Sequence, residues 1–156
     1  MRTVTALAAA AAALALAACG TAGDRTAAEP KPAAVAAAPL YERLGRTEGI
    51  GKVVDDLMVN IGRDARINTF FAKADPVRVR RLLVEQICAG SGGPCTYTGR
   101  SMVESHKQFQ IREEHFNALV EDLVAALDKN GVPKAEQAEL LAVLGPMKAE
   151  IVNVKG

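Results

Sequence analysis

Apolar residues recur every three or four positions through most of the chain, which is the spacing of one face of an α-helix. Clear stripes of this kind cover residues 50–61, 79–87, 116–127 and 140–151. No segment shows the sustained alternation of polar and apolar residues that a half-buried strand requires. The pattern therefore predicts an all-α domain with four substantial helices.

Capping signals fix several helix ends. Asp75-Pro76 predicts the start of the second helix, with the aspartate as N-cap and the proline in the first turn. The glycine-rich loop at residues 90–94 ends that helix. Asn130-Gly131 predicts the C-terminal cap of the third helix.

Three further features complete the predicted order of elements. Residues 40–45 form a single short helical turn closed by glycine. Pro146 should bend the last helix, because proline removes one backbone donor and its ring crowds the preceding turn. Residues 97–111, between the glycine-rich loop and the third helix, are predicted to be an irregular segment.

The first 39 residues have a different character. Met1-Arg2 precedes an Ala/Leu run that ends at Leu16-Ala-Ala-Cys19, which is typical of a signal peptide over residues 1–18. This ending resembles the lipobox of bacterial lipoproteins, in which the cysteine is acylated after cleavage. An ordinary signal-peptidase site, with Cys19 incidental, is the alternative. Residues 19–39 are rich in Ala and Pro and are predicted to be a lipid-anchored, flexible tether.

Export follows from these features as an expectation. The folded domain is predicted to cover residues 40–154 and to face the periplasm or the cell exterior. Its partner would be a bacterial membrane, reached through acylated Cys19. The formal net charge of +1 gives no reason to expect nucleic-acid binding.

The candidate chemistry lies in the irregular segment. The chain has two histidines, and His106 stands between two predicted helices. A short segment that offers one imidazole to the interior of a helical domain is how such a protein presents a single axial ligand to a flat cofactor. His106 is therefore the candidate proximal ligand of a haem iron. No Gly-x-Ser-x-Gly, P-loop or paired His-Glu motif indicates a hydrolase or transferase.

Ordered motifs over residues 40–154 resemble those of group I truncated haemoglobins, the two-over-two helical globins. They are Leu40-Tyr-Glu-Arg-Leu-Gly, Val53-Val-Asp-Asp, Arg66-Ile-Asn-Thr-Phe-Phe71, Gly92-Gly-Pro-Cys-Thr-Tyr-Thr-Gly99, Met102, His106 and His115-Phe116. The resemblance implies four main helices around a haem, with His106 as the iron ligand. It implies as haem contacts Met58, Phe70, Phe71, Val79, Leu83, Met102, Phe116 and Leu119. Because the chain has no Cys-x-x-Cys-His, haem b should be held without covalent bonds.

The distal side departs from this family. Relatives commonly carry a tyrosine at the position of Met58, and often a glutamine on the following helix, where this chain has Val79 and Leu83. Gln86 lies one turn beyond Leu83 and is expected to point at solvent, with a position inside the distal pocket as the alternative. Bound dioxygen would then lack a hydrogen bond worth about 1.5–3 kcal/mol.

Cys88 and Cys95 flank the glycine-rich loop. In an exported protein, two cysteines this close are expected to form a disulfide. A zinc site built from both cysteines with His106 and His115 is the alternative, although the spacing matches no common zinc motif.

The function expected from these features is reversible binding of a small diatomic ligand, such as oxygen, nitric oxide or carbon monoxide, rather than enzymatic catalysis. Two alternatives stay open. One is a haem redox protein, either an electron carrier with a redox partner or a peroxidase-like enzyme. The other is a haem-free structural lipoprotein.

Overall fold

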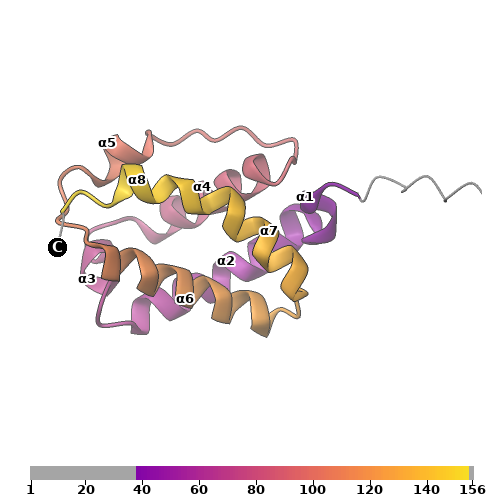
Figure 1. Cartoon of the computed structure of the whole chain (residues 1–156), viewed down its shortest axis with the longest axis horizontal. Helices are drawn as coiled ribbons and strands as arrows, with labels where there is room; N and C mark the ends of the chain where they lie inside the picture. The colour runs from indigo at the N-terminus through magenta and orange to yellow at the C-terminus, as the bar shows by residue number, and fades with distance from the viewer. Residues whose placement is uncertain (1–37, 155–156) are drawn as a thin grey trace, which may run out of the picture. The chain divides into compact units, whose positions relative to one another are not determined.

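The computed structural model describes residues 38–154, and every regular element within this range is helical. In chain order these are α1 (Leu40–Arg43), α2 (Arg46–Arg63), α3 (Asn68–Phe71), α4 (Pro76–Gly90), α5 (Met102–His106), α6 (Glu113–Lys129), α7 (Lys134–Leu144), the 3-10 helix η1 (Gly145–Met147) and α8 (Lys148–Ile151) (Figure 1). The predicted signal peptide, and all but the last two residues of the predicted tether, lie outside this range.

Two helix pairs pack on one another. Helix α2 contacts both α4 and α6, and α4 also contacts α7, so the α2–α4 pair meets the α6–α7 pair (Figure 1). At the interface, the apolar stripe of α2 packs against residues of the second pair. The most deeply buried side chains there include Ile50, Val54, Ile61, Leu127 and Leu140. This is the predicted two-over-two arrangement.

The predicted helix ends agree with the structure at several points. The Asp75 carboxylate accepts a hydrogen bond from the backbone N–H of Val77 at 3.0 Å and caps α4. Gly131 follows α6 with a φ of +69°, a left-handed conformation that glycine adopts at little cost. Pro146 lies in η1, which interrupts the last helix between α7 and α8.

The segment predicted to be irregular contains the short helix α5. The Ser101 side chain accepts a hydrogen bond from the N–H of Glu104 at 3.2 Å, which caps the helix that carries His106. The four-residue helix α3 was also not predicted.

A disulfide joins Cys88, near the end of α4, to Cys95 in the loop that leads to α5. Cys88 is fully buried and Cys95 is half-buried. Two backbone hydrogen bonds hold the same loop: Gly93 N–H donates to the Cys88 carbonyl at 2.8 Å, and Tyr41 N–H donates to the Ser91 carbonyl at 3.0 Å.

Between residues 38 and 154, none of the helices combines the length and the apolar character that crossing a bilayer would require.

Candidate functional site

A cavity of about 580 Å³ lies between the helix pairs and is lined mostly by apolar side chains. Its volume falls in the range of roughly 300–1,000 Å³ that is usual for small-molecule and cofactor sites. The residues predicted to contact a haem that line it are Phe70, Phe71, Val79, Leu83, Met102, His106, Phe116 and Leu119.

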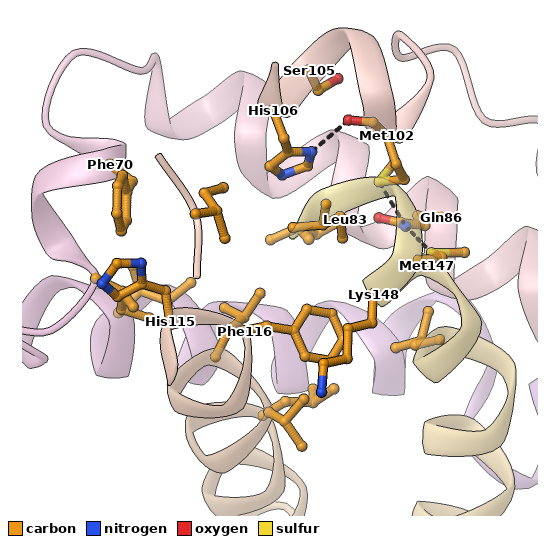
Figure 2. Close-up of a pocket in the computed structure, with 18 of the residues that line it drawn as sticks. Phe70, Leu83, Gln86, Met102, Ser105, His106, His115, Phe116, Met147 and Lys148 are labelled. Carbon is orange, nitrogen blue, oxygen red and sulfur yellow. Dashed lines mark hydrogen bonds between the residues drawn. The ribbon is translucent and has the colours of Figure 1, made fainter. Parts of the chain in front are cut away.

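His106 reaches this cavity from the end of α5 (Figure 2). Its Nδ1 lies 2.7 Å from the backbone carbonyl of Met102. A carbonyl oxygen only accepts, so Nδ1 carries the proton and Nε2 keeps its lone pair. This is the tautomer that a metal ligand needs, and the carbonyl fixes the orientation of the ring.

The backbone at His106 is held from the C-terminal end of the domain. The Asn153 side chain donates to the His106 carbonyl at 2.8 Å and accepts from the Ile111 N–H at 2.9 Å. Asn153 N–H also donates to the Ile111 carbonyl at 3.0 Å. The segment after α8 therefore brackets the turn that follows α5.

The apolar walls suit a flat, largely apolar guest. Phe70, Phe71, Leu83, Phe116 and Leu119 all face the cavity and are only half-buried, although they lie between packed helices. Large apolar side chains that keep contact with an interior space gain further burial only when that space is filled. Together with the free Nε2 of His106, these walls fit an iron porphyrin.

The structure does not place one predicted haem contact, Met58, in the cavity wall. Met58 is absent from the cavity lining, where Leu57 and Ile61 represent α2 instead. Successive residues of a helix point about 100° apart, and of this pair it is the buried Leu57 that reaches the cavity. Met58 is half-buried and packs against the hydrophobic core.

Gln86 does not point at solvent as expected. It lines the cavity, and its amide nitrogen lies 2.9 Å from the sulfur of Met147 and 3.6 Å from that of Met102 (Figure 2). It follows Leu83 at the i+3 position, so both lie on one face of α4. The wall offered by α4 is therefore less uniformly apolar than predicted.

Several lining residues were not predicted as part of the site. His115 packs edge-on against Phe70 with ring centroids 4.9 Å apart, and its Nδ1 accepts from the Arg112 N–H at 3.1 Å. The Lys148 ammonium lies 5.9 Å from the centre of the Phe116 ring and pairs with Glu113. The apolar stripe of α6 includes Phe116 and Leu119, which lie three positions apart. This periodicity gave no reason to assign His115, a polar residue in the first turn of the helix, to the cavity.

Tyr97 also lines the cavity. Burial raises the pKa of its phenol, the nearby Glu85 carboxylate adds to this effect, and a hydrogen bond with Ser105 opposes it. Hydrogen bonds from Thr98 lower the pKa of Glu85, so this neighbour is held as a carboxylate.

The zinc alternative is wrong for the part of the chain that the structure describes. The two cysteines are bonded to each other, and no group of three or more His, Cys, Asp or Glu residues in residues 38–154 gathers closely enough to hold a metal ion.

Comparison with known proteins agrees with this geometry. The bacterial-like globin family model matches residues 39–153. The chain is 38% identical over 120 residues to the group 1 truncated hemoglobin GlbN of Synechocystis sp., with 73% of this chain and 97% of the relative covered. It is 32% identical to the GlbN of Mycolicibacterium paratuberculosis, with 74% and 85% covered.

Solved structures show the same fold. The Fe(III) truncated hemoglobin of Tetrahymena pyriformis superposes with a TM-score of 0.72 at 27% identity, covering 74% of this chain and 99% of that one. The cyanomet 2/2 hemoglobin of Synechococcus sp., which has a covalently attached heme, gives a TM-score of 0.71 at 25% identity and covers 75% and 100%. The chain described here belongs to the bacterial-like globin family, as a truncated haemoglobin whose cofactor is a non-covalently bound haem b.

Proposed function

We propose that this protein binds haem iron through Nε2 of His106 and reversibly binds a small diatomic ligand on the opposite side of the haem. The observation that carries the proposal is the His106 ring, which projects into an apolar cavity with Nδ1 bonded to the Met102 carbonyl. When bound, the haem supplies an iron atom that coordinates the gas. The protein would supply the imidazole of His106 and a mostly apolar surrounding.

Residues of α4 form the part of the cavity wall where we expect the gas ligand to bind. Val79 and Leu83 offer dispersion contacts and no hydrogen bond. A ligand with little bound charge, such as carbon monoxide, should therefore bind ferrous iron well. Dioxygen carries partial negative charge when bound, and hydrogen bonds to charged groups are the stronger ones. Because Val79 and Leu83 cannot donate such a bond, dioxygen should dissociate quickly.

Export and lipid anchoring at a bacterial membrane are part of the proposal. The Leu16-Ala-Ala-Cys19 ending of the apolar N-terminal run supports them. The Cys88–Cys95 disulfide supports export as well, because disulfides persist mainly in oxidising compartments.

The two histidines of the chain give a matched pair of variants for the test. We expect His106→Ala to lose stoichiometric haem binding, followed by titration of the Soret band, and to recover it when imidazole is added. His115→Ala should still bind haem and, once reduced, carbon monoxide, because that ring engages the Arg112 backbone through Nδ1. Unchanged spectra in His106→Ala would refute the assignment.

A further inference from the structure

A carboxylate oxygen is buried without a partner where α2 packs on α6. Asp122 lies on α6, and its Oδ2 atom is buried with no hydrogen-bond partner among residues 38–154. Asn60 of α2 donates to the backbone carbonyl of Asp122 at 3.0 Å, which places this residue at the contact between the two helices (Figure 1). One turn before and after it on α6 are Ala118 and Ala126, which carry no charge. A buried polar group without a partner costs free energy, and an ionised one costs more.

The nearest cation is already engaged by other carboxylates. Arg66, in the turn after α2, binds the Asp64 carboxylate through Nε at 2.9 and 3.0 Å and through Nη2 at 2.7 Å. Its Nη1 donates to Glu121 on α6 at 2.7 Å. Asp64 and Glu121 therefore share the guanidinium, and Asp122 is left beside two further negative charges.

These neighbours make Asp122 the member of the group that gains most from a proton. Burial raises the pKa of its carboxyl group, and the charges of Asp64 and Glu121 add to this effect, whereas Arg66 opposes it. The hydrogen bonds from Arg66 lower the pKa of Asp64, so that neighbour stays ionised. A proton taken up at this contact therefore goes to Asp122.

The same two helices form walls of the haem cavity. Helix α6 contributes Val120 and Leu123, which flank Asp122 in the chain, and α2 contributes Leu57 and Ile61. Asp122 itself does not line the cavity. A change that loosens the contact between α2 and α6 therefore loosens the walls that hold a haem.

The direction of the pH effect follows from the raised pKa of Asp122 in the folded chain. Well below the ordinary pKa of an aspartate, the side chain is neutral in the folded and the unfolded chain, and its burial carries no cost of charge. As the pH rises, the unfolded chain releases this proton first, which favours unfolding. Above the raised value the folded chain is ionised as well, and the full cost is present.

We propose that Asp122 makes the α2–α6 contact responsive to protons: the neutral carboxylic acid tightens this contact and slows haem loss, and the ionised carboxylate loosens it. The part that concerns haem rests on haem binding at His106. This residue then favours retention of haem in mildly acidic surroundings and its release in neutral ones.

The test compares wild type with Asp122→Asn, which keeps the shape of the side chain and cannot ionise. The matched control is Glu150→Gln, which makes the same change of net charge at an exposed residue of α8. Haem transfer from each holoprotein to an excess of a haem-accepting apoprotein, and chemical denaturation, are measured from about pH 4 to about pH 8.

At the upper end of this range, Asp122→Asn should lose haem about three- to tenfold more slowly than wild type. Its folding equilibrium constant should be higher by a similar factor, which is modest because the Asp122 side chain is only half-buried. Both ratios should fall toward one at the lower end, where both side chains are neutral. Because each comparison is a ratio at one pH, the other titrations that the proteins share cancel. Glu150→Gln should follow wild type throughout.

Other results overturn the inference. Ratios that stay the same at every pH would show that the proton on Asp122 has no role. Faster haem loss or easier unfolding of Asp122→Asn at neutral pH would show that the carboxylate stabilises the contact. An equal effect in Glu150→Gln would assign the change to net charge. If none of the three proteins takes up haem, the proposed function fails, and the denaturation profiles still decide whether Asp122 makes the contact responsive to protons.

Discussion

At the scale of single residues, Leu83 is the position where a hydrogen-bond donor to the gas ligand could be introduced. It lines the cavity from α4, in the helical register that also brings Val79 and Gln86 to that wall. We expect Leu83→Gln to slow oxygen dissociation by about ten- to hundredfold, the effect of one hydrogen bond to a charged acceptor worth about 1.5–3 kcal/mol. Stopped-flow or laser photolysis of the ferrous oxygen complex measures it.

Gln86 provides the matched comparison, because it is the amide that α4 already carries into the cavity. Its donors are directed at Met102 and Met147, so Gln86→Leu should leave oxygen dissociation within about threefold of wild type, less than the loss of one net hydrogen bond. A slow wild-type rate that rises sharply in Gln86→Leu would contradict an apolar ligand pocket.

Single residues also show where the sequence was ambiguous. Leu57 and Met58 are both apolar and both fall within the stripe of α2. Helical periodicity assigns both to the inward side and cannot decide which one meets a cavity and which one meets the core. Gln86 was misassigned for a related reason: an amide is usually solvated, and the two sulfur atoms that receive it lie 16 and 61 residues away in the chain.

At the scale of elements, the placement of His106 depends on a tie to the C-terminal segment. Asn153 makes two side-chain hydrogen bonds, to the His106 carbonyl and from the Ile111 N–H. We expect Asn153→Ala to lower the free energy of unfolding by about 1–2 kcal/mol and to speed haem loss, because α5 gains freedom. Transfer of haem to an excess of a haem-accepting apoprotein measures the loss.

A second asparagine separates general stability from this specific effect. Asn60 on α2 donates to the Asp122 carbonyl on α6 at 3.0 Å and does not line the cavity. Asn60→Ala should also lower the melting temperature and leave the rate of haem loss close to wild type. Equal acceleration in both variants would mean that Asn153 acts through overall stability alone.

The disulfide is the other tie near α5. Because it closes a loop of only a few residues, its reduction should cost about 2–3 kcal/mol of unfolding free energy by loop entropy. The haem spectrum should change little, since the bonds from Gly93 to Cys88 and from Tyr41 to Ser91 still hold the loop. Chemical denaturation with and without reductant measures the difference. Two thiols that react in the denatured protein before reductant is added would rule out the bond.

Elements were predictable in proportion to their length. The four long helices carry stripes of several turns, so their existence, and the caps at Asp75 and Gly131, could be read from the sequence. Helices α3 and α5 have four and five residues, little more than one turn, and no period can appear over that length. For α5 the usable signal was Ser101 three residues before Glu104, an N-capping pattern.

At the scale of the whole molecule, the two-over-two arrangement followed from family motifs rather than from helix pattern alone. Amphipathic stripes say that four helices share a core, and they do not say which pairs touch. The contacts of α2 with α4 and α6 depend on side chains that the sequence separates widely. The cavity arises from this packing, so its lining could be named only where a known family supplied the register.

The remaining property of the whole molecule is its attachment to a membrane. Removal of Arg2 with the signal peptide would take the 19 basic residues to 18, against 18 acidic residues. A nearly neutral protein has little electrostatic attraction to anionic lipids, so attachment would depend on acyl chains at Cys19. We expect wild type to enter the detergent phase and to resist washing with high salt, which would release a protein held by charge. Cys19→Ser should move the protein to the soluble fraction with its haem spectrum unchanged, because the predicted domain begins at residue 40. A wild-type protein that is already soluble would show that Cys19 carries no lipid and would refute the lipoprotein hypothesis.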